Sequence, residues 1–415
     1  MTLVRQTRIP APDAMAYLYL PTNPGAWEER NSMRMLVLGA GIQGSACAFD
    51  LLRSSDAEVT LADANPEPLP PFLKVARGKR LRIVRLDARD HDAVASLFAG
   101  HDAVLNALPY YLNLEMAQLA VKVGIHYADL GGNTDIVRKQ HTLSDEAEEK
   151  KVSIMPDCGL APGLVNVLAA EGVRRLDEVE TVKLFVGGLP QNPQPPLNYN
   201  IVYSLEGLLD YYTTPSWIVR DGKPQTVEAL SELEIVEFPE PIGRLEAFHT
   251  AGGLSTMPWV YEGIPRMEYK TLRYPGHAHL IRTIKQLGLL DTDPIVVDGA
   301  EVRPRDVFIA VADPKLRKPN VRDVVALKVT VTGQKSGEPI VVGFDLLDFY
   351  DEENEISAMM RTTGYSLSIT GQMQVGGRVE HWGVTTAYEG MPFEPYVSAL
   401  AKRGVDIKET VQSVT

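Results

Sequence analysis

The sequence predicts an α/β protein with a doubly wound parallel sheet, joined to a second, α+β domain that has a mixed or antiparallel sheet. Three observations lead to this class. A glycine-rich turn follows the apolar run Met35–Leu38, and strand-like and helix-like segments then alternate as far as Pro156. After Pro156, strand-like segments follow one another with fewer helices between them.

Length and composition limit the classes of protein to consider. The chain has 415 residues, 45% of them hydrophobic, which is more than one core usually organises and predicts two domains. A net charge of -13 without basic and aromatic clusters predicts no nucleic-acid partner. Two cysteines, Cys47 and Cys158, are too few for a disulfide framework or a zinc site, so we expect a reducing, cytoplasmic location and no metal. No apolar run approaches the roughly 18 residues of a membrane span, so no membrane partner is expected.

A glycine-rich turn links the first strand to the first helix. Gly39 suits the tight turn, Gly41 lets the backbone approach a pyrophosphate, and Gly44 lets helix and strand pack closely. The phosphates would lie at the N-terminus of the helix, where free N–H groups and the helix dipole favour anions. The turn therefore predicts a Rossmann fold that binds a dinucleotide. Its residues are Gly39, Ala40, Gly41, Ile42, Gln43 and Gly44.

An acidic residue ends the second strand, about twenty residues beyond the glycine turn. Asp63 follows the apolar run after Glu58, where a carboxylate accepts hydrogen bonds from the adenosine ribose. The same carboxylate repels the 2′-phosphate of NADP, and no arginine occurs in residues 64–67. The sequence therefore favours NAD over NADP.

Later strand ends are expected to border the same cofactor, because open α/β sheets bind ligands at the carboxyl ends of their strands. Asp87 and Ala88 would border the adenine. The backbone of Asn106, Ala107, Leu108 and Pro109 would face the ribose and the nicotinamide, and a strand cap is the alternative role. We expect six strands, at Met35–Leu38, Glu58–Ala62, Leu81–Leu86, Ala103–Leu108, His126–Leu130 and Ser153–Pro156.

The middle of the chain alternates strands with few helices. Val179–Val186 and Trp217–Arg220 are expected to be strands, and Leu205–Tyr212 a short helix. Val324–Val331 is expected to pair with Ile340–Tyr350. These segments predict the mixed or antiparallel sheet of the second domain.

Several motifs resemble the saccharopine dehydrogenase superfamily, and within it the L-lysine 6-dehydrogenases. The resemblance runs from about Met35 to the C-terminus and departs at the N-terminal extension. The later motifs are more specific than the glycine turn. The motifs are the glycine turn, Asp157-Cys158-Gly159-Leu160-Ala161-Pro162-Gly163, Gly187–Pro190 with Pro195–Tyr199, Leu272–His277 and Arg361–Gly364.

The resemblance implies a division of the chain and a reaction. Residues 34–158 would form the NAD-binding Rossmann domain and residues 159–355 the substrate-binding domain, which would also dimerise. Residues 356–415 would form helices that pack back on the Rossmann domain. Residues 1–33 are an N-terminal extension, explained either by a misassigned start codon or by an arm that covers a neighbouring surface. The implied reaction is NAD-dependent deamination of the ε-amine of L-lysine by a dimer or higher homo-oligomer.

Removal of hydride from the ε-carbon requires a neutral amine, whose pKa in water is about 10.4. A base must therefore take a proton. Asp157, at the carboxyl end of the last Rossmann strand, is the first candidate, and a helix cap is the alternative role. His277 is the second candidate, and a hydrogen-bonded histidine at the start of a helix is the alternative.

The α-carboxylate of lysine needs a cationic partner, for which a guanidinium has the best geometry. Arg273 and Arg361 lie in the matching motifs, and each could instead hold the two domains together. Tyr199 offers a hydroxyl after the proline-rich loop, although a tyrosine between apolar residues is more often part of a core. Two further functions stay open: a saccharopine or carboxynorspermidine type of reductase, and a dinucleotide-binding regulator without catalysis.

The cofactor preference leads to a first prediction. Replacing Asp63 with Ser or Gly removes the charge that repels a 2′-phosphate, so the preference for NAD over NADP should narrow. The measurement is the ratio of kcat/KM values for the two cofactors. An unchanged ratio would show that Asp63 does not discriminate between them.

Overall fold

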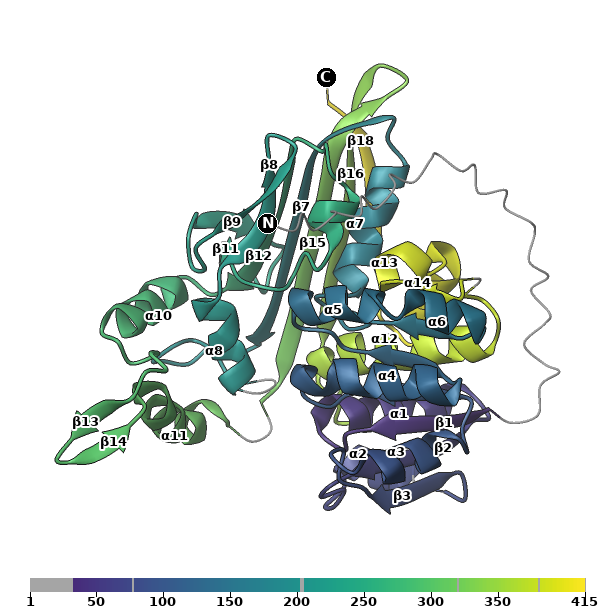
Figure 1. Cartoon of the computed structure of the whole chain (residues 1–415). Coiled ribbons are helices and arrows are strands. Elements are labelled where there is room, and N and C mark those ends of the chain that lie inside the picture. The colour runs from purple at the N-terminus through teal and green to yellow at the C-terminus, as the bar shows by residue number, and fades with distance from the viewer. Residues whose placement is uncertain (1–32, 77, 202–204, 319–320, 380, 415) are drawn as a thin grey trace, which may run out of the picture.

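The computed structural model describes residues 33–415 apart from residues 77, 202–204, 319–320, 380 and 415. The N-terminal extension expected at residues 1–33 therefore lies almost wholly outside the described residues. None of the helices in the described part combines the length and the hydropathy that a bilayer span requires. The chain forms two sheets, each with its own covering helices (Figure 1).

The first sheet is parallel throughout and confirms the Rossmann prediction. Its strand order is β17-β6-β5-β4-β1-β2-β3, so the order reverses between β1 and β4, which creates the crevice where such sheets bind ligands. Six strands lie where the sequence predicts them, and a seventh, β17, comes from the C-terminal part of the chain. The strands are β1 (Arg34–Leu38), β2 (Glu58–Asp63), β3 (Leu81–Arg85), β4 (Ala103–Asn106), β5 (His126–Asp129), β6 (Ser153–Met155) and β17 (Gly383–Val384).

Helices cover both faces of this sheet because its strands are apolar on both sides. One face packs with α1, α2 and the C-terminal helix α12, and the other with α3, α4 and α6. The helices are α1 (Ile42–Ser54), α2 (Pro71–Ala76), α3 (His91–Phe98), α4 (Asn113–Val123), α5 (Thr134–His141), α6 (Ser144–Glu149) and α12 (Ala358–Val375), with a 3-10 turn η1 (Tyr110–Leu112).

The second sheet is mixed: β12 and β7 run parallel, and the other pairs are antiparallel. The pairing of Val324–Val331 with the strand that follows it is confirmed, with Val324 opposite Phe349 and Val331 opposite Val342. The strands are β7 (Glu178–Pro190), β8 (Ser216–Arg220), β9 (Lys223–Val227), β10 (Glu234–Glu237), β11 (Arg244–His249), β12 (Arg266–Arg273), β15 (Asp323–Lys335), β16 (Glu338–Phe349) and β18 (Lys408–Ser413).

The helices of the second domain lie beside this sheet and at its end (Figure 1). A separate hairpin, β13 (Ile295–Val297) with β14 (Ala300–Val302), projects from the α10–α11 region. The helices are α7 (Leu164–Arg174), α8 (Leu205–Thr213), α9 (Met257–Val260), α10 (His277–Gln286), α11 (Pro304–Leu316), α13 (Ala387–Gly390) and α14 (Phe393–Ala401).

The C-terminal segment joins both domains. Helix α12 packs on α1, and its Gly364 permits the approach, because a Cβ there would lie 2.7 Å from the Cβ of Ala46 and 2.8 Å from the carbonyl oxygen of Gln43. The last strand, β18, pairs with β16 of the second sheet, where the sequence predicts helix. All six residues of β18 are exposed, so the strand carries no buried apolar alternation that the sequence could reveal.

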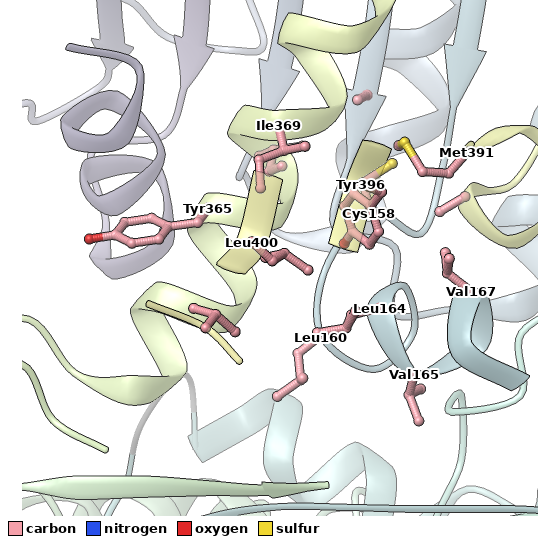
Figure 2. Close-up of a cluster of buried hydrophobic side chains, with 14 of the residues drawn as sticks. Cys158, Leu160, Leu164, Val165, Val167, Tyr365, Ile369, Met391, Tyr396 and Leu400 are labelled. Carbon is pink, nitrogen blue, oxygen red and sulfur yellow. The ribbon is translucent and has the colours of Figure 1, made fainter. Parts of the chain in front are cut away.

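The core is continuous where the chain passes from the first domain to the second. Figure 2 shows Cys158, Leu160 and Leu164 beside Ile369 of α12 and Leu400 of α14. These side chains are between 0% and 4% exposed. The turn between β6 and α7 is therefore fixed by packing from the C-terminal helices.

Arg361 belongs to this framework. Its guanidinium forms ion pairs with Asp348 at 3.0 Å and Asp351 at 3.2 Å and donates to the carbonyl oxygens of Arg403 and Gly404. The side chains of Arg361 and Asp348 are 11% and 5% exposed. Of its two expected roles, the structure supports that of holding segments of the chain together, and we do not include Arg361 in the substrate site.

Arg361→Met should lower the free energy of unfolding by about 3 kcal/mol, because it leaves two largely buried carboxylates without their partner. Urea unfolding measures this change. The matched control is Arg322→Met, which removes an exposed ion pair with Glu352 and should cost less than about 1 kcal/mol. Equal costs for the two variants would contradict the structural role of Arg361.

Candidate active site

The glycine turn has the geometry of a pyrophosphate cradle. Gly39 has φ 93°, and a Cβ there would lie 2.9 Å from the carbonyl oxygen of Ala107. A Cβ at Gly44 would lie 1.8 Å from the carbonyl oxygen of Gly39, whereas one at Gly41 would meet no atom within 4 Å. Packing therefore requires glycine at positions 39 and 44, and Gly41 leaves open space in front of the turn.

The start of helix α1 leaves groups that a dinucleotide could satisfy. No side chain caps this helix at Gly41, so its first N–H groups are available to an anion. The Oε1 atom of Gln43 is buried and has no hydrogen-bond partner among the described residues. Ile42 begins the helix and is 37% exposed. The free N–H groups at the start of α1 fit the phosphates of a dinucleotide.

The two acids expected at the adenosine end differ in their contacts. Asp63 accepts hydrogen bonds from the backbone N–H groups of Ala40, at 2.8 Å, and Asn65, at 2.7 Å. Its carboxylate is thus fixed against the glycine turn. Asp87 is exposed and pairs with Arg89 at 2.7 Å, and this hydrogen-bonded guanidinium lowers the pKa of Asp87 to about 2. Ala88 lies between Asp87 and Arg89 in the turn before α3.

Residues 107–109 follow β4 at the same edge of the sheet. The buried side chain of Asn106 fixes them, since its Oδ1 accepts from the N–H of Leu108 at 3.2 Å. Its Nδ2 donates to Asn113 and to the hydroxyl of Tyr127, both at 2.9 Å. The end of β4 is therefore held rigidly beside the glycine turn.

Asp157 lies at the end of β6, where the chain leaves the Rossmann domain. It is 2% exposed and has φ 61°, a left-handed conformation that side chains rarely adopt. Its Oδ2 accepts a short hydrogen bond from the hydroxyl of Ser255, a residue of the second domain. Its Oδ1 is buried against Gly131, where a Cβ would lie 1.7 Å away, so only glycine fits there.

Burial raises the pKa of the Asp157 carboxyl to about 7, and the nearby Asp129 adds to the rise, while the Ser255 hydrogen bond lowers it. Asp129 ends β5 and is fully buried. Burial raises its pKa to about 6, although it accepts hydrogen bonds from Gln140 and the N–H of Gly131. Two acids that titrate near neutrality thus lie at adjacent strand ends, an arrangement typical of proton transfer sites.

A pocket of about 190 Å³ opens beside this pair, between the two domains. Its walls include Tyr110, Tyr211 and Trp217, and two acids, Asp135 and Asp210. Tyr110 donates to Asp210 at 3.4 Å. None of the described residues that line the pocket is Lys or Arg. The pocket is therefore aromatic, and of its two acids Asp210 is already compensated by an ion pair with Arg305 at 2.6 Å. The aromatic walls and Asp135 suit a small cation.

Gly132 and Gly252 form part of this lining, and Asp157 lies behind the Gly131–Gly132 segment. A Cβ at Gly132 would lie 3.4 Å from the hydroxyl of Tyr211, so the phenol approaches the same segment from the pocket side. Burial, together with Tyr269 and Asp157, raises the pKa of Tyr211 above its usual value, so its hydroxyl stays protonated. Tyr211 therefore places a protonated phenol between the pocket and Asp157.

A chain of polar side chains continues from this wall into the second domain. Tyr269 interacts electrostatically with both Tyr211 and Arg273. The Arg273 guanidinium lies 4.6 Å from the ring centre of Tyr199, donates to the hydroxyl of Tyr212 at 3.2 Å and is 4% exposed. The structure therefore brings two of the expected substrate residues, Arg273 and Tyr199, into contact.

His277 completes this chain but is not placed as a base. Its Nδ1 lies 3.0 Å from the carbonyl oxygen of Leu197 and therefore donates, so its Nε2 accepts from the hydroxyl of Tyr212, also at 3.0 Å. Burial and the charge of Arg273 lower the pKa of His277 to about 3. With both nitrogens engaged and the ring neutral, His277 positions Tyr212 and Arg273. This is the hydrogen-bonded histidine that the sequence offered as the alternative.

One group in the described residues has metal-ligand spacing: Glu232, His249 and Glu268, whose ligand atoms lie within 4.8 Å of one another. Arg220 pairs with Glu232, and Arg266 pairs with Glu268 at 2.9 Å. Cationic side chains thus already compensate both carboxylates, and we assign no metal to this group.

Sequence reasoning missed Tyr110, Asp129, Asp210, Tyr211, Ser255 and Tyr269. Asp129 could have been found, because it ends a strand at the edge already assigned to the cofactor. Tyr211 and Ser255 belong to segments without a motif, and only the meeting of the two domains brings them to Asp157.

Comparisons with known proteins agree with this geometry. Residues 35–155 match the family model of the saccharopine dehydrogenase NADP binding domain, and residues 159–405 that of the saccharopine dehydrogenase C-terminal domain. A curated relative is the mitochondrial alpha-aminoadipic semialdehyde synthase of Bos taurus, 25% identical over 275 residues, which are 63% of this chain. That match covers 29% of the bovine protein, so the chain spans less than a third of its length.

Among solved structures, the apo histidine-tagged saccharopine dehydrogenase (L-Glu forming) of Saccharomyces cerevisiae has the same fold. The TM-score is 0.75 at 19% identity, over 92% of this chain and 100% of that chain. The first matched domain carries the glycine turn and Asp63, which fit a nicotinamide dinucleotide, and both matched domains contribute residues to the wall of the pocket. The chain therefore belongs to the saccharopine dehydrogenase family of oxidoreductases.

Proposed function

We propose that this protein is an NAD-dependent amino-acid dehydrogenase that deaminates the ε-amine of L-lysine. The products are ammonia and 2-aminoadipate 6-semialdehyde, which cyclises to piperideine-6-carboxylate. The observation that carries the proposal is the aromatic pocket that has Asp135 in its wall and the Gly131–Gly132 segment between it and Asp157. Such a pocket accepts an ammonium group and disfavours a second dicarboxylate.

The glycine turn, Asp63 and residues 107–109 would hold NAD at the carboxyl edge of the sheet. A bound nicotinamide supplies the acceptor for the hydride that leaves the ε-carbon. Asn106 keeps residues 107–109 in place, and the aromatic walls of the pocket exclude water from the amine.

Asp157 is the proposed base. With a pKa of about 7 it is about half ionised at neutral pH, and the ionised carboxylate accepts a proton from the substrate ammonium. Asp157 then releases this proton to solvent, and after hydride loss its carboxylate takes a proton from the water that attacks the iminium carbon. It passes that proton to the nitrogen of the adduct, which leaves as ammonia while the adduct hydroxyl loses its proton to solvent and becomes the aldehyde oxygen. Tyr211, which stays protonated, donates a hydrogen bond to the oxygen of the adduct. Ser255 keeps Asp157 oriented throughout.

Arg273 is the proposed partner of the α-carboxylate. Tyr269 interacts electrostatically with both Arg273 and Tyr211, so the proposed cation is coupled through Tyr269 to the wall of the pocket. This arrangement supports binding of an amino acid with its two ends apart. The ring of Tyr199 packs against the Arg273 guanidinium, and the neutral His277 lies near it.

A saccharopine-type reaction is the alternative, and the name of the yeast structure favours it. The name of the bovine relative contains the same semialdehyde that we propose as product. A spectrophotometric panel of lysine, ornithine, saccharopine and diamines with NAD and NADP distinguishes the two functions. Faster oxidation of saccharopine than of lysine would replace our proposal with the alternative.

The pKa of Asp157 leads to a pH prediction. The value of kcat/KM for lysine should rise through pH 7 as Asp157 ionises, and continue to rise toward about pH 9 as the amine loses its proton. Ser255→Ala removes a hydrogen bond to the carboxylate, which raises its pKa and should move the first inflection to higher pH.

Asp157→Asn serves as the control for this profile. It should abolish the inflection near pH 7 and lower kcat by about 10²-fold or more. The pKa of Asp157 is raised in the folded protein, so wild type loses stability as the pH rises from about 4 to about 7. The Asn variant escapes this loss, and its Tm at pH 8 should be at least that of wild type. A normal rate in this variant would exclude Asp157 as the base.

Isotope labelling tests which amine is lost. Lysine labelled with nitrogen-15 only at the ε-position should release labelled ammonia, because the proposed site places the α-carboxylate away from the hydride acceptor. Lysine labelled only at the α-position is the matched control and should release unlabelled ammonia. Mass spectrometry of the ammonia decides, and the reverse pattern would assign the reaction to the α-carbon.

A further inference from the structure

We propose that Arg85 binds the 2′-phosphate of NADP, so that this chain binds both dinucleotides and the Asp63–Arg85 pair sets the ratio between them. The inference rests on the proposed dinucleotide cofactor and names the residue that decides its kind. Residues 64–67 contain no arginine, and the sequence therefore favoured NAD over NADP.

Arg85 reaches the adenosine end from the neighbouring strand. Strands β2 and β3 are parallel, and their register places Arg85 directly opposite Asp63. Both residues stand at the carboxyl ends of their strands, the edge where the adenosine ribose lies in such sheets. An arginine 22 positions later in the sequence is thus adjacent to Asp63 in the fold.

The guanidinium of Arg85 lies over the turn that follows Asp63. Its Nε donates to the carbonyl oxygen of Ala64 at 3.0 Å, and its Nη2 donates to Oδ1 of Asn65 at 3.1 Å. Its Nη1 makes no hydrogen bond to any described residue, and the side chain is exposed. Asn65 and Arg85 together form a polar turn with donors left for phosphate oxygens.

Asp63 only partly offsets the attraction between Arg85 and a 2′-phosphate. Both of its carboxylate oxygens accept backbone hydrogen bonds, from Ala40 and Asn65, which hold the carboxylate against the glycine turn. The 2′ position of the ribose would therefore lie between a fixed anion and an exposed guanidinium. A phosphate there is repelled by Asp63 and accepts a charge-assisted hydrogen bond from Arg85. NADP binding is therefore weakened and not excluded.

Arg89 provides a matched control. It follows β3 in the turn before α3, four positions after Arg85, and it pairs with Asp87 through Nε, at 2.9 Å, and Nη2, at 2.7 Å. Its charge is compensated by that carboxylate. Removing Arg89 changes the formal charge as much as removing Arg85, without removing donors from the turn after Asp63.

The test measures the Kd values of NAD and NADP by calorimetry, on the full chain without amino acid. Wild type should bind both dinucleotides. Arg85→Ala should raise the Kd of NADP about tenfold, because the loss of one charge-assisted contact is worth about a factor of ten. The Kd of NAD should stay within about twofold of the wild-type value. Arg89→Ala should leave both Kd values within about twofold. Asp63→Ser should lower the Kd of NADP about tenfold, and the double variant Asp63→Ser/Arg85→Ala should return this Kd to about its wild-type value.

Three results would overturn the proposal. They are no measurable NADP binding by wild type, an unchanged Kd for NADP in Arg85→Ala, and an equal loss of both dinucleotides, which would mean that Arg85 only shapes the turn. Because lysine is absent, failure here leaves the proposed reaction untouched. Failure of lysine turnover likewise leaves these Kd values interpretable.

Discussion

The hydrogen bond between Asp157 and Ser255 is the contact on which the candidate site depends. It joins the last strand of the Rossmann domain to the second domain, at the turn where the chain passes from one to the other. Because the bond is buried and Gly131 leaves no room for a side chain, the carboxylate has one available position. Tyr211 and the pocket are placed relative to the Rossmann edge through this same junction.

Adjacent parallel strands concentrate charge at this edge. Successive strands end side by side, so Asp129 and Asp157 are brought together although 28 positions separate them, and burial raises the pKa of each. The same geometry at the other half of the sheet places Asp63 beside Arg85. In one case two acids lie side by side, and in the other an acid lies opposite a guanidinium. The fold supplies the proximity, and the residue types decide the chemistry.

The sequence was sufficient for features whose causes are local. The glycine turn, Asp63 and the first six strands follow from steric demands and apolar periodicity within short segments. Asp157 could be proposed because its strand end was recognisable. Tyr211 and Arg85 could not be proposed from the sequence. Each matters because it lies near a residue that is distant in sequence, Asp157 for Tyr211 and Asp63 for Arg85. Arg361 and His277 lie in motifs that resemble the family. Their polar groups nevertheless bind neighbouring residues of the fold, which the sequence could not show.

Strand β17 has a consequence for synthesis of the chain. It pairs with β6 across more than 200 intervening residues, and helix α12, which covers β4 and β5, also comes from beyond the second domain. During translation, the nucleotide-binding sheet therefore has an open edge and a bare face until nearly the whole chain has left the ribosome. Long-range closure of this kind is slow and leaves apolar surface exposed in the meantime. Fragments that end after residue 158 should accordingly need a chaperone, however complete their binding motif is.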